Sequence, residues 1–186
     1  VSSVLTNPLV KSLVSTSLAK YLTGGAFLGR NFIDLDSTAS AHYLLAKPKV
    51  FAGDFEIGVY ISTSTAATFD VVLSDSVTGQ IGLRLNGSFA AGCKMGTALT
   101  NVEGTTALND GKLHLVVVKR VGQVGTIAVD GVIEATVDNA SVLGDQVVDT
   151  FGLRLGSNIF DGIISRLGLT DLTTPANSEY YRLNSL

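Results

Sequence analysis

From residue 31 onward, apolar and polar side chains alternate over short segments, which is the period of β-strands that bury one face. In the segment 80–86, Ile81, Leu83 and Leu85 fall on one side, and Arg84 falls on the other. Residues 113–120 are almost continuously apolar, which predicts a strand covered on both faces. The predicted strands cover residues 31–36, 54–61, 68–74, 80–86, 113–120, 125–129, 132–137, 151–155 and 163–169.

Turn residues separate these strands. Residues 76–79 join two of them as a hairpin, and Asp130-Gly131 is a strong signal for a two-residue hairpin loop. No proline interrupts the predicted strands, and no helical pattern lies between them. Many short strands joined by Gly, Asp, Asn and Ser turns predict an antiparallel sandwich or barrel, so the fold class is all-β.

Residues 4–22 have a helical pattern instead. Asn7 followed by Pro8 is typical of a helix start, and Gly24-Gly25 is typical of a helix end. The apolar side chains between them recur on one face, namely Leu9, Val10, Leu13, Val14, Leu18, Tyr21 and Leu22. Two interpretations are open: the helix packs on its own domain, or it is an arm that docks on neighbouring molecules. Residues 1–29 are thus expected to form a helical arm and linker, and residues 30–186 the sandwich.

Composition favours a protein that works within an assembly. The chain has 186 residues, enough for one domain, and only 16% of them are charged, against about 25% in an average soluble domain. A surface so poor in charge is weakly protected against association. We therefore expect a homo-oligomer or contacts with neighbouring proteins of a larger particle, made through the apolar face of the N-terminal helix. The formal net charge of −3 argues against nucleic acid, because phosphate binding needs a basic face.

Cys93 is the single cysteine, so no disulfide can form within the chain, and a small buried side chain is its expected role. An interchain bridge or a reactive thiol is the alternative. The sequence has no run of about 18 uncharged apolar residues that would predict a membrane span. Residues near the N-terminus do not have the pattern of a signal peptide, because Lys11, Lys20 and several hydroxyl side chains interrupt the apolar positions.

Three stretches carry motifs in a characteristic order and spacing, namely residues 110–120 followed by 125–131, residues 151–156 followed by 160–167, and residues 53–57. Together they resemble laminin-G-like and pentraxin-like domains of the concanavalin-A-like lectin superfamily. Residues 110–120, followed by 125–131, are similar to the central hairpin of these domains, with Leu113-His114 where they usually carry Trp-His. Residues 151–156 and 160–167 are similar to their closing pattern, and residues 53–57 to an early strand. The resemblance covers roughly residues 30–172 and implies a two-sheet jelly-roll sandwich. It also implies a structural, hydrogen-bonded role for His114.

Among the enzymes of this superfamily, the β-glucanase branch places two glutamates around an aspartate on one strand, and no Glu-x-Asp-x-x-Glu occurs here. No nucleophile elbow, phosphate-binding loop or zinc spacing is present either. His42 lies in an apolar stretch that favours packing or surface exposure over catalysis. The expected protein is therefore not an enzyme.

The resemblance implies two kinds of binding. Calcium is the metal to consider, because many relatives place a site at one rim of the sandwich, and the candidate donors are Asp70 and Asp138; no other cofactor is expected. The candidate contacts for a ligand are Tyr60, Arg84, Asn86, Phe89 and Arg154.

The expected function is a non-catalytic lectin-like module that binds a cell-surface glycan or protein. The composition favours a phage virion protein, such as a tail fibre, head fibre or capsid decoration, with an extracellular or cell-surface location as the alternative. A purely structural virion component and an excised adhesion domain of a larger secreted protein are the other hypotheses.

Overall fold

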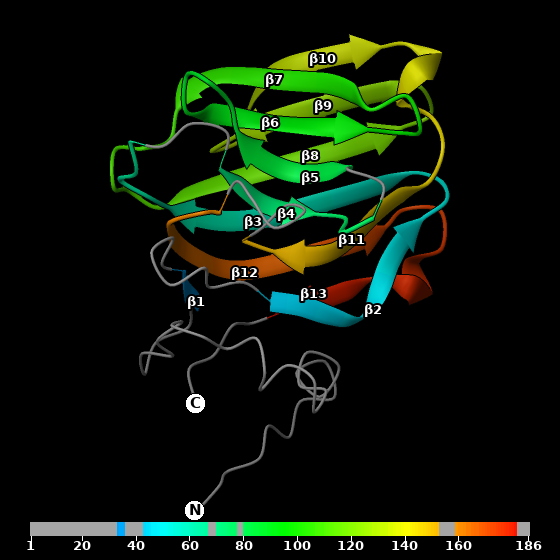
Figure 1. Cartoon of the computed structure of the whole chain (residues 1–186). Coiled ribbons are helices and arrows are strands. Elements are labelled where there is room, and N and C mark those ends of the chain that lie inside the picture. The colour runs from blue at the N-terminus through cyan, green and yellow to red at the C-terminus, as the bar shows by residue number, and fades with distance from the viewer. Residues whose placement is uncertain (1–32, 36–42, 67–69, 78–79, 153–158, 182–186) are drawn as a thin grey trace, which may run out of the picture.

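The computed structural model describes residues 33–35, 43–66, 70–77, 80–152 and 159–181. These residues form two antiparallel β-sheets that pack face to face (Figure 1). The predicted N-terminal helix, His42 and Arg154 lie outside the described residues. The predicted all-β, two-sheet sandwich is confirmed.

The seven-stranded sheet has the order β1-β12-β3-β8-β9-β10, with β13 paired to β12. Its members are β1 (Ile33–Leu35), β3 (Phe55–Ser62), β8 (His114–Val121), β9 (Val124–Val129), β10 (Val132–Asp138), β12 (Gly162–Asp171) and β13 (Glu179–Tyr181). The six-stranded sheet has the order β2-β11-β4-β5-β6-β7. Its members are β2 (Tyr43–Phe51), β4 (Val71–Ser74), β5 (Ile81–Leu85), β6 (Ala90–Met95), β7 (Thr100–Ala107) and β11 (Gln146–Phe151). Two single-turn 3-10 helices, Ala140–Val142 and Pro175–Asn177, lie in connections.

The alternating pattern places the core between the sheets. On β3, Phe55, Ile57, Val59 and Ile61 are fully buried, and the intervening residues are half-buried on the outer face of the seven-stranded sheet. The six-stranded sheet contributes a matching set of buried side chains, which includes Leu73, Leu83, Leu85, Cys93, Met95 and Val148. Burial of these side chains is the main stabilising term of the sandwich.

Five strands were not predicted from the sequence, namely β2, β6, β7, β11 and β13. The strand predicted at residues 151–155 shares only Phe151 with β11, and its residues 153–155 lie outside the described residues. β6 and β7 form a hairpin from small and polar residues that carry little alternation, and β2 contains Pro48 and two lysines. Proline is tolerated in β2 because this strand lies at the sheet edge, and its pairing register with β11 shifts between the Lys49 and Leu44 positions, which flank Pro48.

The prediction for residues 113–120 was wrong in one respect. β8 is not covered on both faces by the described residues: Val116 and Val118 are buried in the core, whereas Leu115 and Val117 are half-buried on the outer face. A continuous apolar run does not distinguish a two-sided core strand from a strand with an apolar outer face.

Side chains close the sandwich at its edges and at one end. Glu134 of β10 accepts hydrogen bonds from the backbone N–H groups of Thr105 (3.0 Å) and Thr106 (3.2 Å) of β7, which joins the two sheets. Burial works to raise the pKa of Glu134, but a hydrogen bond from the Thr106 side chain and these two backbone hydrogen bonds outweigh it and hold the pKa below its ordinary value. At the end where β3 begins, the buried guanidinium of Arg120 donates to three backbone carbonyls, those of Val142 and Gly144 between β10 and β11 and that of Gly53 between β2 and β3.

Candidate functional site

The other end of the sandwich, where β3 ends and β8 and β12 begin, carries a polar pocket of about 440 Å³. We call it the rim pocket. It is lined by Ser62, Thr63, Ser64, Thr65, Ala66, Gly111, Asp161, Gly162 and Ile163. Hydroxyl groups, a carboxylate and exposed backbone dominate this lining, so the pocket offers hydrogen-bond donors and acceptors at close spacing.

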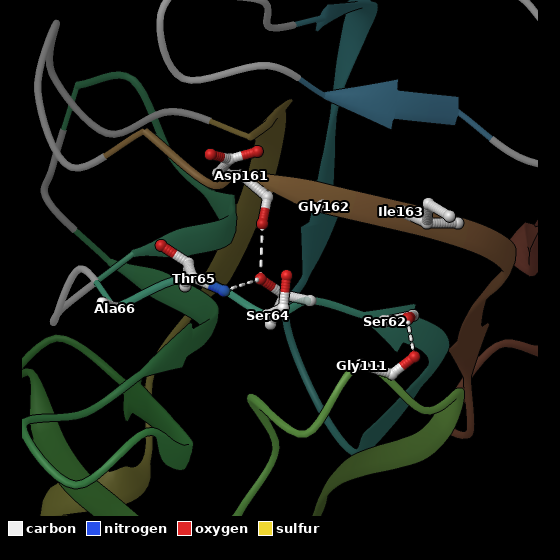
Figure 2. A pocket seen from close by; sticks show the side chains of 9 residues that line it. Ser62, Ser64, Thr65, Ala66, Gly111, Asp161, Gly162 and Ile163 are labelled. Carbon is white, nitrogen blue, oxygen red and sulfur yellow. Dashed lines mark hydrogen bonds between the residues drawn. The ribbon is translucent and has the colours of Figure 1, made fainter.

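Hydrogen bonds hold the three segments of the pocket together, as Figure 2 shows. The Thr63 hydroxyl donates to the backbone oxygen of Asp161 at 2.5 Å and accepts from the backbone N–H of Thr65 at 3.0 Å. The Ser62 hydroxyl donates to the backbone oxygen of Gly111 at 3.0 Å, and the backbone N–H of Gly111 donates to the backbone oxygen of Thr63 at 2.9 Å. The pocket wall is thus fixed before any ligand arrives, which lowers the ordering cost of binding.

Gly162 permits the close approach of β12 to β3. Its φ of 152° lies in a region that side chains rarely adopt. A Cβ added there would lie 2.4 Å from the Ser62 backbone oxygen and 2.9 Å from the Thr63 Cβ. The Phe160-Asp161-Gly162 turn therefore needs its glycine to hold Asp161 at the pocket.

Asp70 lies behind the pocket wall and is 3% exposed. Its carboxyl group interacts with the Thr65 side chain and with the Asp161 backbone. Burial raises the pKa of Asp70 to about 6; the Thr65 hydrogen bond works against this rise, and the negative charge of Asp161 adds to it. Oδ2 of Asp70 has no hydrogen-bond partner among the described residues. A buried carboxylate oxygen without a partner is costly, and it needs a cation, a proton or water to satisfy it.

A second polar cluster lies on the same rim. His114 contacts Asp130 through Nδ1 at 2.8 Å and Asp110 through Nε2 at 3.0 Å. Burial works to lower the pKa of His114, but the two carboxylates outweigh it and raise the pKa above its ordinary value. Asp130 also accepts the backbone N–H of Leu115 at 2.9 Å, so the cluster ties the β9–β10 hairpin to the start of β8. The hydrogen-bonded role expected for His114 is confirmed.

The structure brings together two of the predicted ligand contacts. Arg84 pairs with Glu103, whose other oxygen accepts from Asn86 at 3.4 Å, so Arg84 and Asn86 share one carboxylate on the six-stranded sheet. Phe89 ends the turn that begins at Asn86 and has a positive φ of 60°. Tyr60 lies apart from them, on the outer face of the seven-stranded sheet.

The two predicted metal donors lie at opposite ends of the sandwich. Asp70 is at the rim pocket, whereas Asp138 is exposed and pairs with Val124, at the end where β3 begins.

Sequence reasoning did not select Thr63, Thr65 or Asp161. The available signals were the hydroxyl-rich run 62–65 directly after a strand and the Asp161-Gly162 turn.

Among the described residues, no group of three or more His, Cys, Asp or Glu side chains gathers in one place as a metal cluster. The wall of the rim pocket nevertheless fits a hard cation, because the unpartnered oxygen of Asp70 behind it, the carboxylate of Asp161 and the neighbouring hydroxyl and carbonyl oxygens are the donors that Ca²⁺ prefers. Within the same residues, no helix is both long and apolar enough to span a bilayer.

Cys93 is buried in the core, and burial raises the pKa of its thiol to about 12, which makes it unreactive.

No protein-family model and no curated protein sequence matches this chain. Solved structures do. A candidate carbohydrate-binding protein from Bacteroides ovatus superposes with a TM-score of 0.58 at 17% identity, over 84% of this chain and 52% of that one. The heptameric SAP-like pentraxin of Limulus polyphemus gives 0.57 at 13% identity, over 82% of each chain. Domains LG4-5 of the mouse laminin α1 chain give 0.53 at 13% identity, over 86% of this chain and 46% of that one.

These similarities establish the fold. The chain has the concanavalin-A-like sandwich of laminin-G-like and pentraxin-like domains, as the sequence motifs indicated. It spans about half the length of the laminin and Bacteroides chains that it matches.

Proposed function

We propose that this chain is a non-catalytic, lectin-like module that binds a carbohydrate in the rim pocket. The observation that carries the proposal is the pocket itself, which presents preorganised hydroxyl, carbonyl and carboxylate groups at one end of a rigid sandwich. Sugars are recognised by such networks, because each hydroxyl of the ligand both donates and accepts. A similarly folded Bacteroides structure described as a candidate carbohydrate-binding protein supports this class of ligand.

Calcium fits this proposal as a structural ion. Asp70 and Asp161 would hold it behind the pocket wall, where it would offset their negative charges and fix the segments of Thr65 and Asp161 that line the pocket. Binding of a cation would also relieve the burial of the unpaired Asp70 charge.

The geometry does not favour a glycosidase. A general acid must reach the leaving oxygen directly or through one water. Asp70 has a raised pKa suited to that role, but it is 3% exposed and lies behind Thr65. Its environment is better explained by ion binding than by proton transfer to a substrate.

The experiment is binding of a glycan library to the full chain, with and without Ca²⁺, followed by titration calorimetry of the best ligand. Asp161→Asn should weaken that ligand at least ~10-fold, since it removes a charge-assisted contact. Asp138→Asn is the matched control, because it makes the same chemical change at the opposite end of the sandwich. Equal affinities of Asp161→Asn and the unaltered chain would place binding elsewhere.

A second candidate function is a structural part of an assembly, such as a virion. The observation that favours it is the low charge, 16% of residues, together with the predicted N-terminal arm at residues 1–29. Light scattering after size exclusion distinguishes the two: a defined oligomer that requires residues 1–24 supports assembly, and a monomer in both forms contradicts it.

A further inference from the structure

The outer face of the seven-stranded sheet has a second hollow, a groove of about 370 Å³ across β13, β12, β3 and β8. Four residues in register cross it: Tyr180 pairs with Gly168, Gly168 with Gly58, and Gly58 with Val117. The two adjacent glycines leave a depression in the sheet face. Nothing lies within 4 Å of the position where a Cβ of Gly58 would be, so the depression is open there.

The rest of the groove is mainly apolar and aromatic. Tyr60 and Leu115 are paired beside Gly58 and Val117, and both are half-buried on this outer face. Tyr180 is 59% exposed although its ring lies against Gly168. An apolar hollow with exposed aromatic side chains is the kind of surface that other groups cover.

Strand pairing shows where the described chain begins relative to the groove. β1 pairs with the edge of β12 that faces away from β3, with Leu35 opposite Gly162 and Ile33 opposite Ile164. β13 occupies the same edge from Leu167 onward, with Tyr181 opposite Leu167. Ile33, the first described residue, is thus paired two positions away from Arg166, which lines the groove. The inner face of the sheet is filled by the core, so the outer face is the open surface next to the start of β1.

We infer that the apolar face of residues 7–22 docks in this groove of its own chain as an amphipathic helix. Leu9 to Leu18 would span roughly 14 Å at 1.5 Å per residue. The four strands that line the groove are separated by three spacings of about 4.8 Å, which also span roughly 14 Å. Residues 23–32 can extend up to about 33 Å, more than enough to reach the groove from the start of β1. An apolar side chain of the helix would then fill the space over Gly58.

The docking is tested in the full chain with a photo-crosslinking amino acid at Leu13, on the apolar helical face, and at Ser12, on the polar face, as the matched control. From Leu13, cross-links should map to residues 56–60, 115–117, 166–170 and 180 of the same chain. A mixture of isotope-labelled and unlabelled protein distinguishes the same chain from a second copy. A Cβ at position 58 meets nothing within 4 Å, and Gly58→Leu places its side chain in the depression, so it should reduce the Leu13 cross-links at least ~10-fold while the sandwich stays folded.

Hydrogen exchange gives an independent readout. Amides of residues 7–22 should exchange at least ~10-fold faster in Gly58→Leu and in Leu13→Asp than in the unaltered chain, and Ser12→Asp should have no such effect. Cross-links to a second copy, cross-links to another surface, or exchange rates that Gly58→Leu leaves unchanged would each overturn the inference.

Discussion

The buried carboxyl group of Asp70 predicts an unusual pH dependence of stability. Its pKa rises from 3.8 to about 6 on folding, mainly through burial. The folded protein therefore holds the proton more tightly than the unfolded chain, so this group favours folding at low pH. Its contribution is fully present below about pH 3.8 and is lost as the pH rises from there through about 6. A pKa shift of this size changes the free energy of unfolding by about 3 kcal/mol between the protonated and the ionised form, and solvent screening reduces this difference to about 1–2 kcal/mol.

Asp70→Asn replaces the ionisable group with a neutral group of nearly the same shape. We expect the variant to gain about 1–2 kcal/mol of unfolding free energy relative to the unaltered chain at pH 8. At about pH 3, below the ordinary pKa of 3.8, Asp70 is largely protonated in both the folded and the unfolded chain, so the two proteins should be nearly equal in stability. Other groups titrate between these values, but they are common to both proteins and cancel in the difference.

Urea denaturation at about pH 3 and at pH 8, in buffers free of divalent cations, measures this difference. Asp138→Asn is the control, because its exposed carboxyl group has no such surroundings. A variant that is destabilised equally at both pH values would refute the reasoning, since it would show that Asp70 acts through its hydrogen bonds and not through the cost of its charge. If calcium binds here, millimolar Ca²⁺ should stabilise the unaltered chain and not Asp70→Asn.

Three further changes test other contacts. The pKa of His114 is raised in the folded chain, so its pairing with Asp110 and Asp130 stabilises the fold fully below about pH 6.5. This stabilisation weakens as the pH rises through the folded-state pKa. His114→Gln should therefore cost less unfolding free energy at pH 9 than at pH 6, as measured by urea denaturation. Arg120→Met leaves three backbone carbonyls without their donor, and chemical denaturation should show a loss of about 2–4 kcal/mol. Gly162→Ala should cost about 1–3 kcal/mol by thermal or chemical denaturation, through backbone strain and the Ser62 contact, and an unchanged stability would contradict the close approach.

The candidate site was only partly predictable. Asp70 was selected from the sequence as an oxygen donor near a predicted strand, and so was Asp138, but nothing in the local pattern separated the buried one from the exposed one. Burial is decided by what packs over a residue from distant parts of the chain. Thr63 and Asp161, which shape the pocket, are 98 positions apart, and no local pattern links them.

Local periodicity in the sequence determined most strands, the β9–β10 hairpin and the all-β class, because a strand that buries one face must alternate every second residue. Short motifs such as 110–120 and 160–167 were enough to indicate the particular sandwich. Only the tertiary structure decided which outer faces stay apolar, and which loops meet at the rim. It also showed that Gly58 and Gly168 lie side by side. These properties depend on strand order and register between distant segments, and strand pairing is set by the whole core and not by any one strand's own pattern.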